Sequence, residues 1–475
     1  MLYINGEWRH SLSGETIEIY NPATGEKISD VASCGREETR EAIEKAHLAF
    51  QTWKRTSGQE RALLLKKVSD LIRENGEEIA QTITKEMGKP ITEARREIIS
   101  GSNYVEWFAE EAKRIYGETI PAPQMDKHLM LVQQPIGVVG AITPWNYPLS
   151  MVTRKIAPAL AAGCTVVLKP APSTPLTALK VFECFHKAGL PKGVVNLVIG
   201  PAEEIGAELT SNPLVRKITF TGSTAVGKKL IRDSADTVKK ISMELGGHAP
   251  FIVFEDANID SAVEGAISTK FVNNGQTCIC TNRIYVAEEI ADEFGEKLAE
   301  KASQLIIGNG LNENTQVGPL INEQALKKVE THVKDAIDHN GKILCGGERM
   351  EFSNLNGCFY QPTVINYANE SMKIAREETF GPVVPVFTFK SEGEVIEKAN
   401  NTNYGLAAYC YTSDLGRGLR MMHELDYGIV GINDPAPIVT QSPFGGIKES
   451  GIGKEGGKQG IEEYLEKKFV SILIG

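Results

Sequence analysis

Three things are scarce in this sequence of 475 residues: cysteine, long apolar runs and positive charge. Eight cysteines are too few for a disulfide scaffold in so long a chain. No stretch approaches the roughly 18 apolar residues of a membrane span. The N-terminal MLYINGEWRHSLSGE has no basic segment followed by an apolar run. The sequence therefore predicts a cytoplasmic protein with no membrane partner.

Acidic residues outnumber basic ones, with 61 Asp and Glu against 51 Lys and Arg and a net charge of −10. Because this balance repels nucleic acid and anionic membranes, neither is expected as a partner. An anionic ligand would need a local cation. The chain is also too long for one domain of the usual size, about 100–200 residues, so we expect two or three domains.

Two series of short apolar runs alternate with helical patterns. The first contains IGVVGAIT, CTVVLKP, VVNLVIG and KITFTGS, within residues 136–223, and predicts a parallel, doubly wound sheet of the nucleotide-binding kind. The second begins after Gly246 with APFIVF, RIYVAEE, KILCGG and VVPVFTF, separated by predicted helices such as ISTKFVNN. It indicates another α/β unit. Residues 37–75, ahead of both series, have the spacing of amphipathic helices.

Two further segments have extended patterns. GETIPAPQMDKHLMLVQQPI, residues 117–136, combines three prolines with an alternating stretch and is typical of a hairpin arm. The final GIEEYLEKKFVSILIG ends in an alternating strand. We expect this strand to pair with the arm.

Two glycine-rich segments are candidates for a dinucleotide site. GIGKEG at 451–456 matches G-x-G-x-x-G, but no strand leads into it, so we do not expect it to bind pyrophosphate. In ITFTGSTAVG a strand ends before Gly222 and Ser223 and a helix begins before Gly227, where backbone N–H groups can receive a phosphate. An ordinary strand-to-helix turn with an N-cap serine is the alternative.

Four side chains are candidates for chemistry. Cys278 follows the small polar turn GQT and is either an exposed nucleophilic thiol or a buried inert one. Cys280 has no second Cys-x-Cys or His cluster near it in sequence, so no metal site is expected. Glu244 precedes two glycines and is either a base or a helix-end charge. Lys169 closes a strand and is either a ribose or phosphate ligand or a solvated strand end.

Seven motifs follow one another along the chain. They are PWN (144–146), LKP (168–170), FTGS (220–223), MELGG (243–247), GQTC (275–278), EETFGP (377–382) and PFGGIKESGIG (443–453). Through these motifs the sequence resembles the aldehyde dehydrogenase superfamily over essentially its whole length. The resemblance implies an α/β fold with a doubly wound, Rossmann-like NAD(P)-binding domain, a second α/β catalytic domain and a small β oligomerisation arm that builds a homodimer or homotetramer. The expected boundaries are 1–117 and 138–246, 247–460, and 118–137 and 461–475, respectively.

The resemblance also implies a mechanism. Cys278 attacks an aldehyde carbonyl, and the oxyanion of the thiohemiacetal is held by the Asn146 amide and the Cys278 backbone N–H, each donor contributing about 3 kcal/mol. Hydride passes to the nicotinamide, and Glu244 activates water to hydrolyse the thioester. Its presence argues against the branch that transfers the acyl group to coenzyme A. The implied cofactor contacts are Trp145, Lys169, Pro172, Gly222, Ser223, Gly227, Leu245, Glu378 and Phe380.

The substrate is less clearly indicated. ITPWNYP, MVTRKIAPALAAG and QTCICTNR resemble succinate-semialdehyde dehydrogenases, in which two arginines and a serine grip the distal carboxylate. Arg154 matches the first arginine, whereas Val272 and Ile438 replace the other two groups. One arginine favours a small anionic aldehyde, with sulfolactaldehyde or lactaldehyde as alternatives to succinate semialdehyde. The alternative interpretation of Arg154 is a structural residue that ties two helices together by an ion pair.

Three other expectations depend on the resemblance. Pro172 stands where relatives that prefer NAD often carry a glutamate, so we predict that both NAD and NADP are used. Cys280 either forms a redox switch with Cys278, through a strained and reducible bond, or only packs. The alternative to an enzyme is a catalytically silent structural or binding protein of the same fold.

Overall fold

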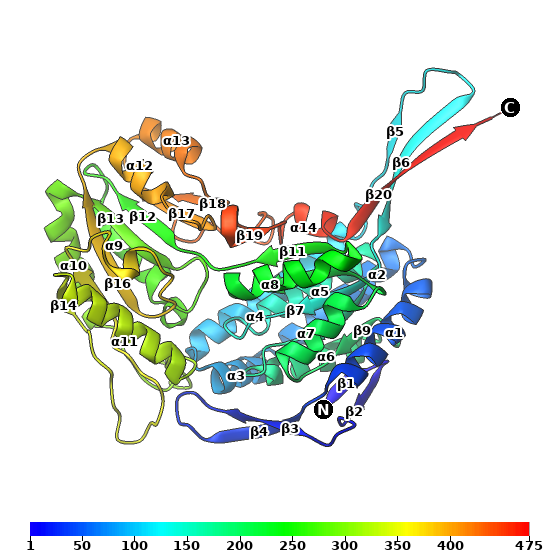
Figure 1. The fold of residues 1–475 in the computed structure, drawn as a ribbon, viewed down its shortest axis with the longest axis horizontal. Helices are drawn as coiled ribbons and strands as arrows, with labels where there is room; N and C mark the ends of the chain where they lie inside the picture. Colours follow the sequence, from blue (N-terminus) through cyan, green and yellow to red (C-terminus); the bar gives the residue numbers. More distant parts are fainter. Residues whose placement is uncertain (475) are drawn as a thin grey trace.

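Two large sheets organise residues 1–474, the part of the chain that this computed structural model describes (Figure 1). The first has eight strands in the order β19-β11-β10-β7-β8-β9-β1-β2. Its strands from β11 to β9 are parallel, and antiparallel strands lie at both edges. The strands are β1 (Leu2–Ile4), β2 (Glu7–Arg9), β7 (Val138–Ile142), β8 (Thr165–Lys169), β9 (Val195–Leu197), β10 (Val215–Thr221), β11 (Lys240–Glu244) and β19 (Gly451–Ile452).

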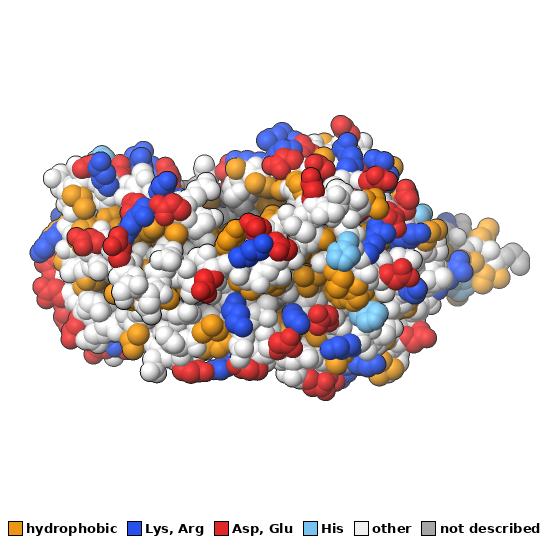
Figure 2. Space-filling view, turned by 90° about the horizontal axis from the view of Figure 1, so that it is seen from below, with side chains coloured by type: hydrophobic (Ala, Val, Ile, Leu, Met, Phe, Trp, Pro, Cys, Tyr) orange, Lys and Arg blue, Asp and Glu red, His pale blue; other side chains and the backbone are white. Residues whose placement is uncertain are grey.

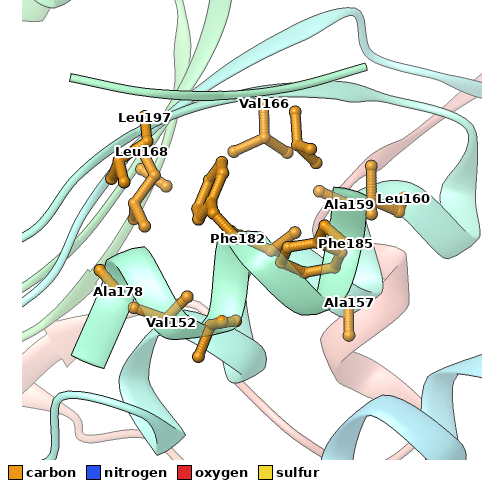
Figure 3. Packing of buried hydrophobic residues seen from close by; sticks show 14 of the residues in the cluster. Val152, Ala157, Ala159, Leu160, Val166, Leu168, Ala178, Phe182, Phe185 and Leu197 are labelled. Carbon is orange, nitrogen blue, oxygen red and sulfur yellow. The ribbon is translucent and has the colours of Figure 1, made fainter. Parts of the chain in front are cut away.

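The central strands are buried because their apolar runs are covered by helices on both faces, as in other parallel sheets. Phe182 and Phe185 of one helix pack beside Val166 and Leu168 of β8 (Figure 3). The doubly wound parallel sheet predicted from the sequence is therefore confirmed. The helices of this part are α1 (Arg36–Trp53), α2 (Gly58–Glu74), α3 (Gly76–Met87), α4 (Ile91–Glu111), α5 (Ser150–Ala162), α6 (Pro175–Ala188), α7 (Ala202–Ser211) and α8 (Thr224–Ser234), with the 3₁₀ turn η1 (Ala235–Thr237).

The second sheet has seven strands in the order β14-β15-β16-β13-β12-β17-β18, all parallel except β14. Its strands are β12 (Ala249–Val253), β13 (Thr281–Ala287), β14 (Lys342–Cys345), β15 (Thr363–Asn366), β16 (Val383–Phe389), β17 (Ala407–Tyr411) and β18 (Ile429–Ile432). Its helices are α9 (Ile259–Lys270), α10 (Ala291–Ser303), α11 (Glu323–Asp338), α12 (Glu392–Asn400) and α13 (Leu415–Glu424). The 3₁₀ turns are η2 (Val272–Gly275), η3 (Glu288–Ile290) and η4 (Lys373–Ala375).

One predicted helix ends earlier than expected. Of ISTKFVNN, only the part up to Lys270 is α-helical, and η2 follows. Asn273 and Asn274 there have φ values of 52° and 57°, so the chain turns through the left-handed region. Asparagine tolerates this region better than most residues, and the Asn-Asn-Gly run breaks the helix.

A three-stranded antiparallel arm projects from the body at the upper right of Figure 1. It consists of β5 (Glu118–Ile120), β6 (Lys127–Pro135) and β20 (Leu465–Leu473). β20 pairs along the whole of β6, from Leu465 opposite Pro135 to Leu473 opposite Lys127. The predicted pairing of the final strand with the hairpin is confirmed. A separate hairpin is formed by β3 (Thr16–Tyr20) and β4 (Lys27–Ala32).

The chain returns to the first sheet before it enters the arm. β19 pairs with β11, although residues 451–452 lie within the range expected for the catalytic domain. The GIGKEG match begins in β19 and lies in this return segment, outside any strand-to-helix turn of the parallel sheet. The remaining short elements are η5 (Lys448–Ser450) and α14 (Gln459–Glu462).

The surface agrees with the acidic but mixed composition. Lysine and arginine alternate with aspartate and glutamate over the face seen in Figure 2, which carries no broad patch of one sign. Within residues 1–474, no helix is long and apolar enough to cross a membrane.

Candidate active site

A cavity of about 550 Å³ brings together residues that follow strands of the first sheet and residues of α11 and the loops of the second α/β unit. Eight of the predicted site residues line it, namely Trp145, Asn146, Gly222, Ser223, Leu245, Cys278, Glu378 and Phe380. Six others do not line it, namely Arg154, Lys169, Pro172, Gly227, Glu244 and Cys280. The structure therefore gathers most of the predicted contacts around one thiol.

The start of α8 forms one wall of the cavity. Ser223 caps this helix, its Oγ accepting the N–H of Val226 at 3.4 Å, and Gly222 precedes it. The helix N-terminus thus presents free N–H groups and a positive dipole end, which suit a phosphate. Gly227, one turn into the helix, packs so closely on Leu245 that a Cβ there would overlap the leucine side chain.

Glu378 and Phe380 also line the cavity. One Glu378 carboxylate oxygen accepts the N–H of Gly247 at 3.0 Å, and burial raises the pKa of Glu378 to about 7. Phe380 has a φ of 58°, which is strained for an aromatic residue and typical of functional positions. Its ring meets Trp145 edge-on, with centroids 5.6 Å apart.

These walls fit a dinucleotide. A helix N-terminus can hold the pyrophosphate, a carboxylate can hold ribose hydroxyls, and aromatic rings can flank a nicotinamide. Gly246 lets the backbone pass close to the Glu378 carboxylate, because a Cβ at this position would lie 3.0 Å from Glu378 Oε2. Lys328 of α11 lines the same cavity and was not identified from the sequence. Its charge lowers the pKa of Glu378 and opposes the effect of burial.

Lys169 and Pro172 lie at the carboxyl end of β8, outside the cavity lining. Lys169 is buried, and its Nζ donates to the Pro170 carbonyl at 3.3 Å. Burial lowers the pKa of Lys169 to about 8, while the nearby charge of Glu203 acts in the opposite direction. Pro172 is exposed in the loop that leads to α6. Lys169 is therefore the buried cation of this edge and not a solvated strand end.

Cys278 is partly exposed to the cavity. Burial, helped by the charges of Glu378 and Glu244, raises the pKa of its thiol to about 12, and Arg154 opposes this shift. The resting thiol is consequently protonated near neutral pH. Gly247 packs against the Cys278 carbonyl, where a Cβ would clash with the oxygen, so the MELGG and GQTC motifs are in direct contact.

Asn146 is held beside Cys278 by a short ladder of amides. Its Nδ2 donates one hydrogen to the Gln276 carbonyl at 2.9 Å, which leaves the second N–H hydrogen for another acceptor. Asn273 Nδ2 donates to the backbone carbonyl of Asn146 at 3.0 Å. Sequence reasoning missed Asn273, although the Asn-Asn-Gly run signals an unusual turn.

Glu244 ends a strand, β11, so its interpretation as a helix-end charge is wrong. The carboxylate is buried, and among the described residues its Oε2 has no hydrogen-bond partner. Burial raises the pKa of Glu244 well above its usual range, and the charge of Glu455 adds to this effect. The nearby cations Lys155 and Arg154 act in the opposite direction. Glu244 therefore has the raised pKa that suits a proton acceptor near neutral pH.

Arg154 belongs to a buried charged cluster on α5. Its guanidinium lies between two aromatic rings, 4.7 Å from the Tyr104 centroid and 4.1 Å from the Phe444 centroid, and donates to the Tyr104 hydroxyl at 3.0 Å. Its Nε is 3.8 Å from a Glu455 carboxylate oxygen, and Lys155 forms an ion pair with the same carboxylate. Arg154 thus ties α5 to α4 and to the return segment, and it lies close enough to Cys278 to influence the thiol.

Cys280 is fully buried, with its thiol near the carbonyl oxygens of Lys270 and Thr281 at 3.6 Å. Burial raises the pKa of Cys280, and the adjacent Lys270 lowers it. All eight cysteines are free. Among residues 1–474, no group of three or more His, Cys, Asp or Glu side chains is placed to hold a metal ion.

Known proteins match this chain along nearly its whole length. The model of the aldehyde dehydrogenase family matches residues 8–470. A 3-sulfolactaldehyde dehydrogenase and a glutarate-semialdehyde dehydrogenase, both of Pseudomonas putida, are each 52% identical, over 99% of this chain and 96% and 97% of their own lengths. An NADP(+) succinate-semialdehyde dehydrogenase of Escherichia coli is 51% identical over 99% of this chain and 97% of its own.

Solved structures have the same fold. An NADP-dependent enzyme of Escherichia coli superposes with a TM-score of 0.98 at 51% identity, covering 99% of this chain and 98% of that one. A betaine aldehyde dehydrogenase of Staphylococcus aureus in complex with NAD+ superposes with a TM-score of 0.97 at 38% identity, covering 100% and 97%. The predicted two α/β domains with a β arm are confirmed as the fold class.

Proposed function

We propose that this chain, which belongs to the aldehyde dehydrogenase family, oxidises a small anionic aldehyde to its carboxylic acid. The predicted resemblance is confirmed, and the chain is an NAD(P)-dependent aldehyde dehydrogenase. The observation that supports the choice of substrate is Arg154, a buried cation whose charge lowers the pKa of the Cys278 thiol. Relatives at about half identity are named for succinate semialdehyde, glutarate semialdehyde and sulfolactaldehyde, which all carry an acid group.

Cys278 forms the covalent bond to the substrate. Its thiol releases its proton to solvent as Sγ attacks the carbonyl carbon. The resulting oxyanion accepts hydrogen bonds from the free N–H of Asn146 Nδ2 and from the backbone N–H of Cys278. The bound dinucleotide supplies the hydride acceptor. Glu244 then takes a proton from the water that attacks the thioester, which releases the acid and restores the thiol. The buried Glu244 carboxylate, whose Oε2 has no hydrogen-bond partner within residues 1–474, supports this role.

Both NAD and NADP serve as the cofactor. In this proposal the α8 N-terminus, Glu378 and Phe380 hold the parts that the two nucleotides share, and Lys169, at the end of β8, meets either a ribose hydroxyl or a 2′-phosphate. Pro172 offers no carboxylate that would repel the phosphate. A ratio of kcat/KM above about a thousand in favour of either nucleotide would contradict this dual use.

A redox switch between Cys278 and Cys280 is part of the proposal. The two thiols flank one residue, and a bond between them would withdraw Cys280 from its buried contacts and block the nucleophile. Peroxide should inactivate the parent enzyme, thiol should restore it, and Cys280→Ser should lose this thiol-reversible response. Equal inactivation and rescue of the variant would contradict the switch.

We place the enzyme in the cytoplasm as a homodimer or homotetramer. Eight free cysteines suit a reducing compartment. The projecting arm exposes Phe469 and Leu473, which a second copy could cover. Sedimentation of the purified protein would test the assembly.

The substrate is tested by kcat/KM for succinate semialdehyde, glutarate semialdehyde, sulfolactaldehyde and uncharged butanal, each with NAD and NADP. We expect the acid-bearing aldehydes to exceed butanal by at least tenfold. Equal rates with butanal would overturn the choice of an anionic substrate. A burst of reduced nucleotide on adding aldehyde excludes a catalytically silent protein.

A further inference from the structure

The strained turn η2 connects the nucleophile to the rest of the site. Asn273 and Asn274 are consecutive left-handed residues, a conformation that costs most residues roughly 1–2 kcal/mol each and costs asparagine less. Such strain persists only where surrounding contacts hold it, and it concentrates at functional sites. The contacts made by these two amides therefore indicate what the turn is for.

The two amides have different partners. Asn273 Nδ2 donates to the Asn146 carbonyl at 3.0 Å and to the Gln276 carbonyl at 3.3 Å. Because Asn146 Nδ2 donates to the same Gln276 carbonyl, Asn273 joins the Asn146 backbone to the turn that carries Cys278. Asn274 Nδ2 instead donates to the Gly318 carbonyl, away from Asn146.

A half-buried carboxylate contacts this ladder. Glu93 of α4 accepts the backbone N–H of Asn273 at 2.8 Å. One helical turn further on, Glu97 accepts the N–H groups of Leu149 and Ser150, at 2.9 and 3.0 Å, just after the loop that carries Asn146. α4 therefore holds the Cys278 turn and the Asn146 loop from one face, at two points spaced as i and i+4.

We propose that Asn273, seated on Glu93, is a positioning residue that aims the free N–H of Asn146 at the oxyanion formed on Cys278. This inference rests on the proposed function. Asn273 touches neither substrate nor cofactor in this arrangement, and it acts through the Asn146 backbone. Without it, Asn146 keeps its bond to Gln276 but loses the contact that fixes the direction of its loop.

The decisive comparison is Asn273→Gly against Asn274→Gly. Glycine accepts the left-handed conformation at both positions, so both variants relieve strain and both leave one buried carbonyl without its amide donor. We expect Asn273→Gly to lower kcat for aldehyde oxidation by about tenfold or more, towards the 10²–10³ that one oxyanion donor contributes. The KM for the aldehyde should change little, and Asn274→Gly should stay within about threefold of the parent.

Alkylation of Cys278 by iodoacetamide provides the second measurement. This reaction uses the same thiol but forms no oxyanion, so its rate should remain within about twofold of the parent in both variants. Equal losses of kcat in the two variants, or an equal loss of alkylation and kcat in Asn273→Gly, would overturn the inference.

Glu93 gives an independent test. Burial raises the pKa of Glu93 to about 7, so the neutral amide of Glu93→Gln resembles its protonated form and still accepts the Asn273 N–H. We expect Glu93→Gln to retain most of kcat and Glu93→Ala to lose as much as Asn273→Gly. Full activity of Glu93→Ala would contradict the seating role. Absence of aldehyde oxidation by the parent would overturn the proposed function, and the inference with it, whereas an active parent with two equal variants overturns the inference alone.

Discussion

The two sides of Cys278 are built from different chemistry. On one side, Asn146, Asn273 and Gln276 form a ladder of neutral amides with contacts of 2.9 to 3.3 Å. On the other side, Arg154 and the ion pair of Lys155 with Glu455 lie buried near the Glu244 carboxylate. Neutral amides fix directions without changing their protonation, whereas buried charges shift one another's pKa values and can exchange protons. In the proposed function, the amide side therefore sets geometry, and the charged side handles protons and substrate charge.

Removal of the carboxylate on the charged side should have the largest effect. Glu244→Gln should lower kcat by about 10²–10⁴, the range for a general base, because the thioester then waits for unassisted water. The rapid burst of reduced nucleotide should persist, since hydride transfer precedes hydrolysis. Stopped-flow absorbance at the nicotinamide band would measure both phases. Loss of the burst would place Glu244 in the first chemical step instead.

The second largest effect, a loss of stability, is expected when the buried ion pair of Lys155 and Glu455 is broken. Lys155→Met leaves the Glu455 carboxylate buried without its lysine partner, and such losses destabilise by about 3–5 kcal/mol. The variant should unfold at a clearly lower urea concentration. The double variant Lys155→Met with Glu455→Gln removes the stranded charge and should recover most of this loss. If the double variant is no more stable than the single one, charge separation is not the cause.

A smaller effect is expected from Arg154→Lys. The substitution keeps the charge but loses the planar guanidinium that stacks between Tyr104 and Phe444. We expect kcat/KM for anionic aldehydes to fall by about tenfold, the loss expected for one hydrogen bond to a charged group. Butanal provides the matched control and should be unaffected. An equal fall for butanal would make Arg154 purely structural.

The mildest effect concerns Lys169, a buried cation whose Nζ donates to a backbone carbonyl, whereas Lys155 forms an ion pair with a carboxylate. Burial lowers the pKa of Lys169 to about 8, so the side chain is charged at pH 7 and neutral at pH 9. Loss of the charge weakens its attraction to a 2′-phosphate, and the ratio of KM for NADP to KM for NAD should rise by up to about tenfold across this interval. Lys169→Met should give a ratio that is high and independent of pH. A flat ratio in the parent would separate Lys169 from nucleotide choice.

The sequence predicted some residues around Cys278 and missed others. Glu244 stands out because it precedes two glycines that permit close backbone approach, and Cys278 stands out because it follows a small polar turn. Both parallel sheets follow from the short apolar runs that alternate with helical patterns. Glu93 did not stand out, because an acidic residue near the start of an amphipathic helix has the pattern of a solvated face. Glu455 pairs with Lys155 across 300 residues, and Asn273 meets Asn146 across 127. No local pattern encodes such contacts, so they emerge only in the folded chain.

The pairing of β6 with β20 has a consequence for synthesis on the ribosome. Pro135 emerges roughly 330 residues before Leu465, its partner in the arm. At about 5–20 residues per second, the β5–β6 hairpin waits on the order of 15–65 s with one strand edge unpaired. Lys155 waits nearly as long for Glu455. The nascent enzyme therefore passes most of its translation with an unpaired strand edge on β6 and without the carboxylate that pairs with Lys155. A chain that ended before residue 455 would contain neither of these two partners.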